Sequence, residues 1–234
     1  MAKGLFITGT DTGVGKTFVA GALATLLRAR GIDVGVMKPA ETGCIRRDGQ
    51  LHPQDALYLR DKAESVDPLD EICPYPLEMP AAPSVAADAA GIAIDLDWIV
   101  DRFHRLARHH QLTLVEGAGG LLVPLTDTDD YTHLIQKLQI PTLLVARASL
   151  GTINHTLLTS RWAGHLKLPI LGVVLNSPTG PPSPSEEANL QALAKRLTTP
   201  LLGCIPHLPG PTLDLSLVEN SLRMDRLLEL LELG

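Results

Sequence analysis

Residues 9–17 read GTDTGVGKT, directly after the apolar run 5–7 and before a stretch with helical patterning. Glycine lacks a Cβ, so a loop of this kind can fold tightly around a phosphate and point several backbone N–H groups at it. In such loops the lysine neutralises phosphate oxygens, and the hydroxyl that follows it ligates Mg²⁺. This phosphate loop therefore predicts a site for a nucleoside triphosphate. Its predicted binding residues are Gly13, Val14, Gly15, Lys16, Thr17 and Phe18.

The spacing of the phosphate loop departs from the strict G-x-x-x-x-G-K-[ST] pattern, because one residue too many separates Gly9 from Gly15. Its context nevertheless supports the prediction. An apolar strand precedes the loop, and residues 18–30 repeat apolar positions at helical spacing. The alternative is a glycine-rich turn with an accidental Gly-Lys-Thr.

The composition of the chain is ordinary for a globular protein, with 234 residues, 45% of them hydrophobic, and a formal net charge of −6. This length fits one domain over residues 1–234, and the acidic balance gives no field that would attract nucleic acid. The apolar start is too short for a signal peptide, and no apolar run reaches about eighteen residues, so we expect a cytoplasmic protein without a membrane span. Cys44, Cys73 and Cys204 lack metal-ligand spacing and are expected to be reduced thiols.

Short apolar strands alternate with helical patterns along the chain, which is typical of a parallel sheet with crossover helices. Nearly continuous apolar runs at 142–145 and 170–175 suit strands that are covered on both faces. The sequence therefore predicts an α/β fold in three layers, with one doubly wound, mostly parallel sheet and helices on both faces. The expected strands are 5–8, 34–38, 112–115, 142–146, 170–175 and 201–205, and the expected helices include 18–30 and 153–167.

Other segments carry weaker structural signals. Prolines between 67 and 90, and again from 178 to 184, predict loops without regular elements. Leucines that recur from 213 to 233 predict one closing amphipathic helix, with a partner-binding helix as the alternative. His109 and His110 end an arginine-rich helical run and are expected on a solvated face.

Polar residues that follow strands are the main functional candidates, because ligands of open α/β sheets gather at the carboxyl ends of the strands. Glu116 follows the expected strand 112–115 and offers a carboxylate to Mg²⁺, unless it is a surface or helix-capping residue. Lys38 would lie beside the phosphate loop if the second strand neighbours the first, but a solvated lysine is equally compatible with its position. The amide of Asn176 could pair with a purine edge or could occupy an ordinary turn.

Together, these segments closely resemble the dethiobiotin synthetase family, and the match runs nearly end to end. The phosphate loop of that family has the same longer gap, so the unusual spacing favours the resemblance. The family implies a P-loop NTPase-like fold. The resemblance is carried by residues 9–17, Lys38-Pro39, 55–57, 115–120, 151–155 and the strand end at Asn176.

The resemblance implies an ATP- and Mg²⁺-dependent cyclo-ligase of biotin biosynthesis. In that reaction 7,8-diaminononanoate and CO₂, supplied as bicarbonate, give dethiobiotin. A carbamate is phosphorylated by the γ-phosphate of ATP, and the second amine then closes the ureido ring. Because a carbamate attacking a phosphate brings two anions together, positive charge must gather at the point of attack. The resemblance assigns this charge to Lys16, Lys38 and Mg²⁺.

The resemblance also implies contacts to the metal, the substrate and the nucleotide. The implied metal ligands are Thr17, Asp55 and Glu116. Thr12 is an implied catalytic hydroxyl, and the implied substrate contacts are Thr12, Lys38, Thr42, Gly151 and Asn154. The family is a homodimer with its substrate at the subunit interface, so Gly151 and Asn154 would reach the partner's diamine. Further implied nucleotide contacts are Gly119, Asn176, Ser177, Pro206 and His207.

The sequence departs from the family pattern at several positions. Gly13 stands where members often carry glutamate, and Thr42 replaces a common serine. Residues 178–189 match no family motif, which leaves the contacts to the carboxylate end of the substrate unassigned.

Two other classes of function compete with this interpretation. A partitioning or positioning ATPase of the same branch would carry a lysine near the start of the phosphate loop, and residues 9–14 contain none. A related amidotransferase synthetase would need a glutaminase domain, for which 234 residues leave no room.

Overall fold

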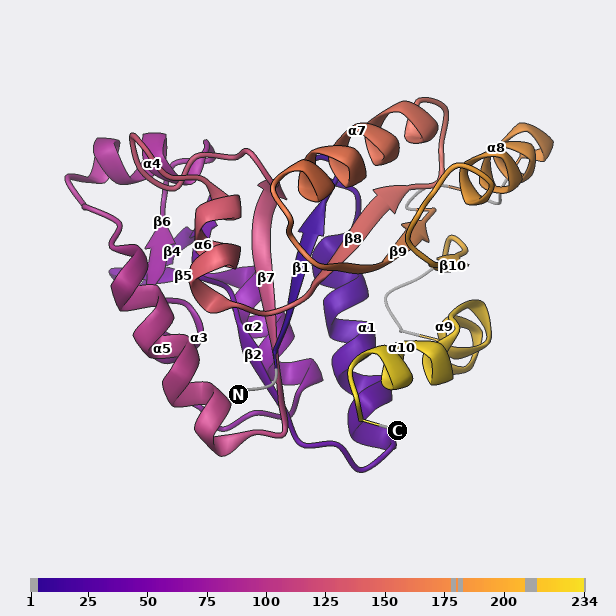
Figure 1. The fold of residues 1–234 in the computed structure, drawn as a ribbon. Helices are drawn as coiled ribbons and strands as arrows, with labels where there is room; N and C mark the ends of the chain where they lie inside the picture. Colours follow the sequence, from indigo (N-terminus) through magenta and orange to yellow (C-terminus); the bar gives the residue numbers. More distant parts are fainter. Residues whose placement is uncertain (1–3, 178–179, 181–182, 209–213, 234) are drawn as a thin grey trace.

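A computed structural model of the chain describes residues 4–177, 180, 183–208 and 214–233. Within these residues, six strands form one parallel sheet in the order β10-β9-β8-β1-β7-β2 (Figure 1). Strand β1 is central, so the phosphate loop that follows it emerges in the middle of the carboxyl edge of the sheet. The strands are β1 (Gly4–Gly9), β2 (Val34–Met37), β7 (Leu112–Gly120), β8 (Thr142–Arg147), β9 (Ile170–Asn176) and β10 (Leu201–Ile205).

Helices cover both faces of the sheet, as the uninterrupted apolar strands require. Along β1, Leu5 and Ile7 pack in a cluster with α1 and α2, whereas Phe6 between them packs with α5 and α6 on the other face. The side-chain period of two in a strand produces this division, and the prediction of a three-layer α/β fold is confirmed. One face carries α1 (Lys16–Ala29), α2 (Gln54–Lys62), α9 (Leu215–Ser221) and α10 (Met224–Leu230), and the other carries α5 (Leu96–His109), α6 (Tyr131–Leu138), α7 (Thr152–His165) and α8 (Pro184–Ala194).

The prediction that residues 67–90 contain no regular element is wrong. This segment forms α3 (Leu69–Ile72), β6 (Tyr75–Leu77) and α4 (Pro83–Ala90). Pro83 occupies the first turn of α4, where a missing N–H costs no helical hydrogen bond. In the described part of the chain, strand β6 pairs with the short β3 (Ala40–Thr42) alone, and such a two-stranded edge tolerates Pro76. The prolines therefore delimit elements here.

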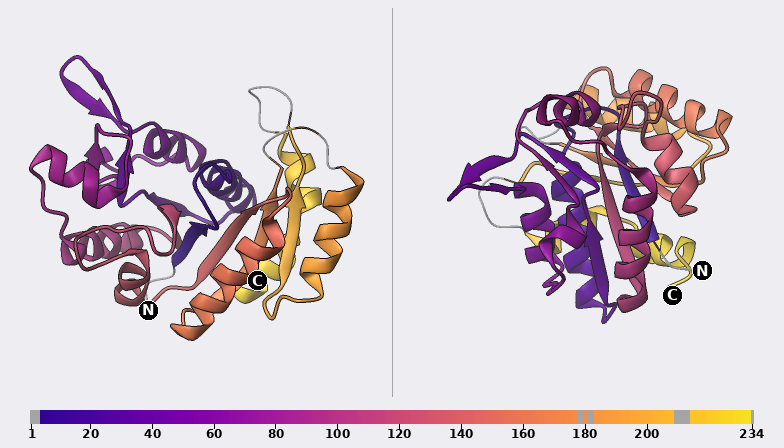
Figure 2. Two further views of the ribbon diagram at one scale, coloured as in Figure 1. Left: turned by 90° about the horizontal axis from the view of Figure 1, so that it is seen from above. Right: turned by 90° about the vertical axis from the view of Figure 1, so that its left-hand side faces the viewer.

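A short hairpin made by β4 (Ile45–Arg47) and β5 (Gln50–His52) projects from the body of the molecule (Figure 2). The predicted single C-terminal helix is also wrong, because α9 and α10 are separated at Leu222 and Arg223. There the backbone N–H of Arg223 donates to the carbonyl of Leu202 at 2.7 Å. Backbone pairing with the last strand therefore interrupts the helix. The predicted loop 178–184 falls mostly outside the described residues.

Within the described ranges, none of the helices combines the length and the hydropathy that a membrane span requires. Cys44 and Cys73 are buried and, within the described structure, form no disulfide.

Candidate functional site

A cavity of about 650 Å³ lies at the carboxyl edge of the sheet, beside the phosphate loop. The loop, the ends of β2 and β7, the first turn of α2 and residues 80–83 contribute its walls. Sequence segments far apart in the chain therefore meet at one place, as the fold class requires. The predicted site residues that line this cavity are Thr12, Gly13, Gly15, Lys16, Thr17, Lys38, Thr42, Asp55, Glu116 and Gly119.

Two buried charges form the centre of this cavity. Lys38 Nζ lies 2.6 Å from Glu116 Oε1 and 2.8 Å from Asp55 Oδ2. The hydroxyl of Thr17 donates to the same Glu116 oxygen at 2.8 Å. The side chains of Lys38 and Glu116 are 4% and 1% exposed, respectively, whereas Asp55 is 42% exposed. The alternatives of a solvated Lys38 and a surface Glu116 are therefore wrong.

The route by which these residues meet differs from the prediction. Strand β7 continues to Gly120, so Glu116 lies inside the strand and not after its end. Strand β2 pairs with β7 and not with β1, which means that the condition stated for Lys38 is not met. Lys38 instead reaches the cavity from the far side of Glu116. Strand β7 thus lies between β2 and β1, and its Glu116 accepts hydrogen bonds from both Lys38 and Thr17.

The two lysines of the cavity have opposite pKa shifts. Burial disfavours the charge of Lys38, but Glu116 and Asp55 together outweigh this effect and raise its pKa. Burial and the positive charge of Lys38 lower the pKa of Lys16 to about 8, because they outweigh the attraction of Glu116 and Asp55. Lys38 therefore stays protonated at neutral pH, whereas additional negative charge in the cavity would favour the protonated form of Lys16.

The donor atoms around Glu116 fit a hard cation. Glu116 Oε2 is buried and, among the described residues, has no hydrogen-bond partner. The hydroxyl of Thr17 and the partly exposed carboxylate of Asp55 lie on the same cavity, and Mg²⁺ prefers such oxygen ligands. No group of three or more His, Cys, Asp or Glu side chains in the described structure could hold a metal by itself. A bound Mg²⁺ would thus need oxygens from a ligand as well.

The phosphate loop has the backbone geometry expected of an anion cradle. Gly13 and Gly15 have φ values of 72° and 92°, in the region that favours glycine, and α1 begins at Lys16. A Cβ on Gly15 would lie 2.1 Å from the amide nitrogen of Asn176. That nitrogen donates to the carbonyl of Val14 at 2.9 Å. The amide of Asn176 therefore supports the loop, which spacing arguments did not indicate.

The remaining predicted nucleotide residues are placed less directly. Val14 is buried in the core, and Phe18 packs against the same core, so only their backbones can serve a phosphate. Ser177 is buried, and its hydroxyl has no hydrogen-bond partner among the described residues. Pro206 and His207 follow β10 and are half-buried. Ser177, Pro206 and His207 lie at neighbouring strand ends, but in the described structure none of these five residues lines the cavity of Lys38.

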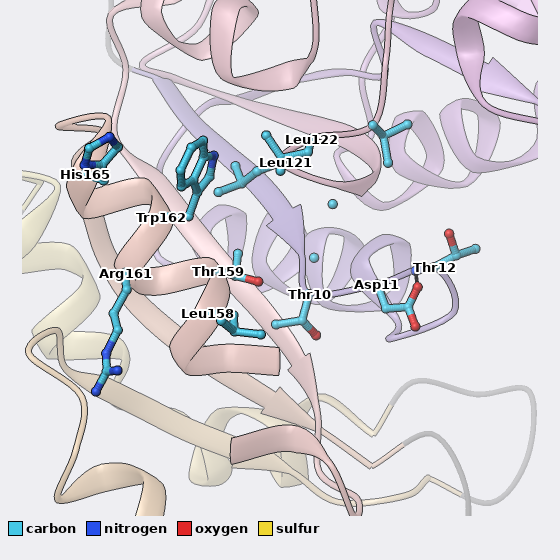
Figure 3. A pocket seen from close by; sticks show the side chains of 13 residues that line it. Thr10, Asp11, Thr12, Leu121, Leu122, Leu158, Thr159, Arg161, Trp162 and His165 are labelled. Atoms are coloured by element: carbon cyan, nitrogen blue, oxygen red, sulfur yellow. Dashed lines mark hydrogen bonds between the residues drawn. The ribbon is translucent and has the colours of Figure 1, made fainter. Parts of the chain in front are cut away.

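A second cavity of about 780 Å³ adjoins the first, with Thr12 and Val123 lining both. Leu121, Leu122 and Leu158 line it with Trp162, and Thr10, Asp11 and Thr12 lie at its loop side (Figure 3). Gly151 and Asn154 are absent from the lining of both cavities in the described structure, and lie instead in a third hollow of about 450 Å³ on α7. One chain alone does not bring them to the phosphate loop.

Sequence reasoning missed two residues that support the site. Glu41 is buried, and its two carboxylate oxygens accept from the backbone N–H groups of Asp55 and Ala56, each at 2.9 Å. Arg147, at the end of β8, lies 3.5 Å from the carbonyls of Thr12 and Gly13. A glutamate three residues after Lys38 and an arginine at a strand end were the available signals. Neither signal separates a supporting role from solvent exposure.

Comparison with known proteins identifies the relatives of this chain. A family model described as an AAA domain matches residues 3–212. The ATP-dependent dethiobiotin synthetase BioD of Anaeromyxobacter dehalogenans is 46% identical over 208 residues, covering 88% of this chain and 91% of that protein. The BioD proteins of Thermodesulfovibrio yellowstonii and Bacillus licheniformis are 42% and 37% identical, covering 89% and 95% of this chain and 90% and 98% of their own lengths.

Similar solved structures include a ParA family ATPase from Chlorobium tepidum and the MinD cell division protein of Aquifex aeolicus, each with a TM-score of 0.54. They are 15% and 17% identical, respectively. Both matches cover 89% of this chain, with 86% and 84% of those chains covered in turn. At this identity the likeness shows the fold alone. The high identity to the BioD proteins over nearly the full length shows that the chain belongs to the ATP-dependent dethiobiotin synthetase family.

Proposed function

We infer that this chain is an ATP-dependent dethiobiotin synthetase, a ligase that converts 7,8-diaminononanoate, CO₂ and ATP into dethiobiotin, ADP and phosphate. Family membership supports this function. The observation that carries it is the pair Lys16 and Lys38, both buried and both lining the cavity beside the phosphate loop. A reaction between two anions needs two such cations in one place.

Each buried lysine has a distinct part in the proposed reaction. Lys16, at the first position of α1, would neutralise the terminal phosphates that the loop N–H groups hold. Lys38 would face the carbamate oxygens and the transferring phosphoryl group. Its raised pKa keeps it charged, so it acts as an electrostatic stabiliser and not as a base. Thr12 and Thr42 line the same cavity and would donate their hydroxyls to the carbamate.

The chemistry then proceeds by two displacements. A carbamate oxygen attacks the γ-phosphorus, ADP leaves, and a carbamic-phosphoric anhydride forms. The second amine attacks the carbamate carbon and loses a proton, the bond from that carbon to the phosphate oxygen breaks, and phosphate departs as the ureido ring closes. Burial strengthens the interactions of Lys16 and Lys38 with the developing charges, because little water remains to screen them.

We propose Mg²⁺ as the accompanying ion, held by Thr17, Asp55 and Glu116. The buried, unpartnered Oε2 of Glu116 in the described structure supports this assignment. When bound, Mg²⁺ would neutralise charge on the β- and γ-phosphate oxygens. Lys38 contacts only the other Glu116 oxygen, so one carboxylate can serve the lysine and the ion together.

We propose that the adjoining apolar cavity accepts the methylene chain of the diamine. Its continuity with the first cavity through Thr12 and Val123 supports this placement. Leu122, Leu158 and Trp162 stay exposed along it, and such an apolar surface favours cover by a second subunit. In a homodimer, Gly151 and Asn154 would contact the diamine bound by the partner.

The proposed adenine contacts are Asn176, Ser177, Pro206 and His207, at the ends of β9 and β10. Neighbouring strand ends suit a base that extends sideways from the phosphate loop. A cytoplasmic location belongs to the same proposal, because ATP is the co-substrate. The buried thiols of Cys44 and Cys73 are compatible with that reducing compartment.

The direct test is incubation of the protein with 7,8-diaminononanoate, bicarbonate, MgCl₂ and ATP, followed by mass detection of dethiobiotin and assay of ADP. Dethiobiotin formed in equal amount to ADP is the expected result. ATP hydrolysis that does not depend on the diamine would contradict the synthetase function and favour an ATPase switch.

A further inference from the structure

Glu41 lies on β3, at the wall of the cavity, and its side chain ends at the N-terminus of α2. Its Oε1 accepts from the N–H of Asp55 and its Oε2 from the N–H of Ala56, each at 2.9 Å. These are the second and third residues of α2, whose first N–H groups have no partner within the helix. The residue before α2 is Pro53, which provides no side-chain cap. Glu41 therefore supplies the cap from a different strand.

The cap fixes the residue that completes the cavity. Asp55 belongs to the capped turn, and its Oδ2 lies 2.8 Å from Lys38 Nζ. A carboxylate on the end of a helix keeps its place only if that first turn is held, because terminal turns fray. Glu41 holds this turn with two charge-assisted bonds from a position that is 5% exposed.

The buried position of Glu41 costs more free energy than a purely structural helix cap requires. Burial raises its pKa, against the two backbone N–H groups that favour the charged form. An N-cap aspartate or serine in place of Pro53 would satisfy the same N–H groups without burying a charge. The arrangement instead connects β3, which begins two residues after Lys38, to the turn that carries Asp55.

We propose that Glu41 is a positioning residue for the cation site, which sets Asp55 against Lys38 by clamping the first turn of α2. Glu41 itself does not contact the ion or the substrate. This inference rests on the proposed function, since Asp55 is a ligand only if the site binds Mg²⁺ with ATP.

The test is the affinity of the protein–ATP complex for Mn²⁺, a paramagnetic substitute for Mg²⁺, measured by electron paramagnetic resonance. Glu41→Gln should weaken Mn²⁺ binding about tenfold, as loss of a group that orients a ligand commonly does. Glu78→Gln is the matched control, because Glu78 is exposed and pairs only with the exposed Arg46 in the described structure. The control should bind Mn²⁺ like the wild-type protein. Glu41→Asp keeps the charge on a shorter side chain and should lie between wild type and Glu41→Gln.

A double-mutant cycle separates positioning from general stability. If Glu41 acts through Asp55, Glu41→Gln should cause almost no further loss of Mn²⁺ affinity in a protein that already carries Asp55→Asn. In the protein without nucleotide, hydrogen exchange at the N–H of Ala56 should accelerate in Glu41→Gln. Unchanged Mn²⁺ affinity in Glu41→Gln, or equal losses in both backgrounds, would overturn the inference. A wild-type protein that binds no Mn²⁺ in the presence of ATP would instead overturn the proposed metal site.

Discussion

The two edges of the central sheet treat buried charge in opposite ways. At the amino edge, His110 donates or accepts through both ring nitrogens, with Asp33 Oδ1 at 3.0 Å and Asp67 Oδ2 at 2.8 Å. At the carboxyl edge, Lys38 is shared between two carboxylates, and Glu116 Oε2 has no partner among the described residues. Both ring nitrogens of His110 therefore have a carboxylate partner, whereas one carboxylate oxygen of the second cluster has none in the described structure.

We interpret this difference as that between a stabilising cluster and the proposed reactive one. A buried polar atom without a partner costs free energy, and the cation that we propose would give Glu116 Oε2 a partner. Lys16 supports the same interpretation. Burial and the charge of Lys38 lower its pKa to about 8, and a bound phosphate would stabilise the protonated lysine. Substitutions at the two edges should therefore affect different properties, activity at one and pH-dependent stability at the other.

The largest effect is expected from Lys16→Ala. It removes the cation at the start of α1, and no other side chain of the phosphate loop can replace it. We expect the rate of dethiobiotin formation to fall on the order of a thousandfold at saturating ATP. Circular dichroism should show an intact fold, because a cavity lysine contributes little packing. A variant that keeps more than roughly a tenth of the wild-type rate would show that the loop is not catalytic.

Lys38→Met should reduce kcat more than it weakens ATP binding, because its proposed partners come together only when the carbamate and the γ-phosphate are both present. It also leaves Glu116 as a buried charge without its main partner, which should lower the free energy of unfolding by about 3 kcal/mol. Steady-state kinetics and urea unfolding measure the two effects.

The double variant Lys38→Met/Glu116→Gln sharpens the comparison of the two edges. It removes both buried charges, so it should regain much of the lost stability while staying inactive. If the double variant were no more stable than Lys38→Met, the unpaired charge of Glu116 would not be the cause of the lost stability. If Lys38→Met raised the KM for ATP without lowering kcat, Lys38 would serve nucleotide binding only.

Glu116→Gln alone keeps the size of the side chain and removes its charge. If Glu116 is a metal ligand, the Mg²⁺ concentration for half-maximal activity should increase at least about tenfold, while saturating Mg²⁺ restores part of the rate. A Mg²⁺ titration at fixed ATP measures this shift. An activation curve that coincides with that of the wild type would leave Glu116 with only its role toward Lys38.

Much of this site could be predicted from the sequence because its signals are local. Lys16 and Thr17 lie in one short loop, and the apolar runs of β1 and β8 determine that both strands are buried on each face. The meeting of Lys38, Asp55 and Glu116 is not local. It depends on the strand order, and β2 lies beyond β7 when counted from β1. The family resemblance, and not spacing, therefore identified Asp55.

Supporting residues escaped prediction for a related reason. Glu41 was not predicted at all, and Asn176 was predicted as a nucleotide contact and not as a support of the loop; both bind backbone groups of distant segments, and no sequence period encodes such contacts. The break between α9 and α10 is similar, because it follows from pairing with β10 and not from a helix-breaking residue at Leu222 or Arg223. His110 was expected on a solvated face, which is wrong, since its two aspartates come from segments before β2 and after α2.

The smallest effect is expected at the amino edge, where His110→Gln should change stability and not activity. Burial alone would lower the pKa of His110, but hydrogen bonds to Asp33 and Asp67 and the charges of those carboxylates outweigh it and raise the pKa above 6.5. When the pKa of a histidine is higher in the folded protein than in the unfolded chain, its protonation stabilises the fold. This stabilisation is complete at a pH below the pKa of the unfolded chain, and it is lost as the pH rises through the pKa of the folded protein. The free energy of unfolding of the wild-type protein should therefore exceed that of His110→Gln by about 1 to 2 kcal/mol near pH 6, and by less near pH 9.

Urea unfolding at both pH values measures this difference, with the exposed His109→Gln as the control. A stability difference independent of pH would mean that His110 contributes packing and neutral hydrogen bonds only. It would contradict the description of His110, Asp33 and Asp67 as an ion-paired cluster.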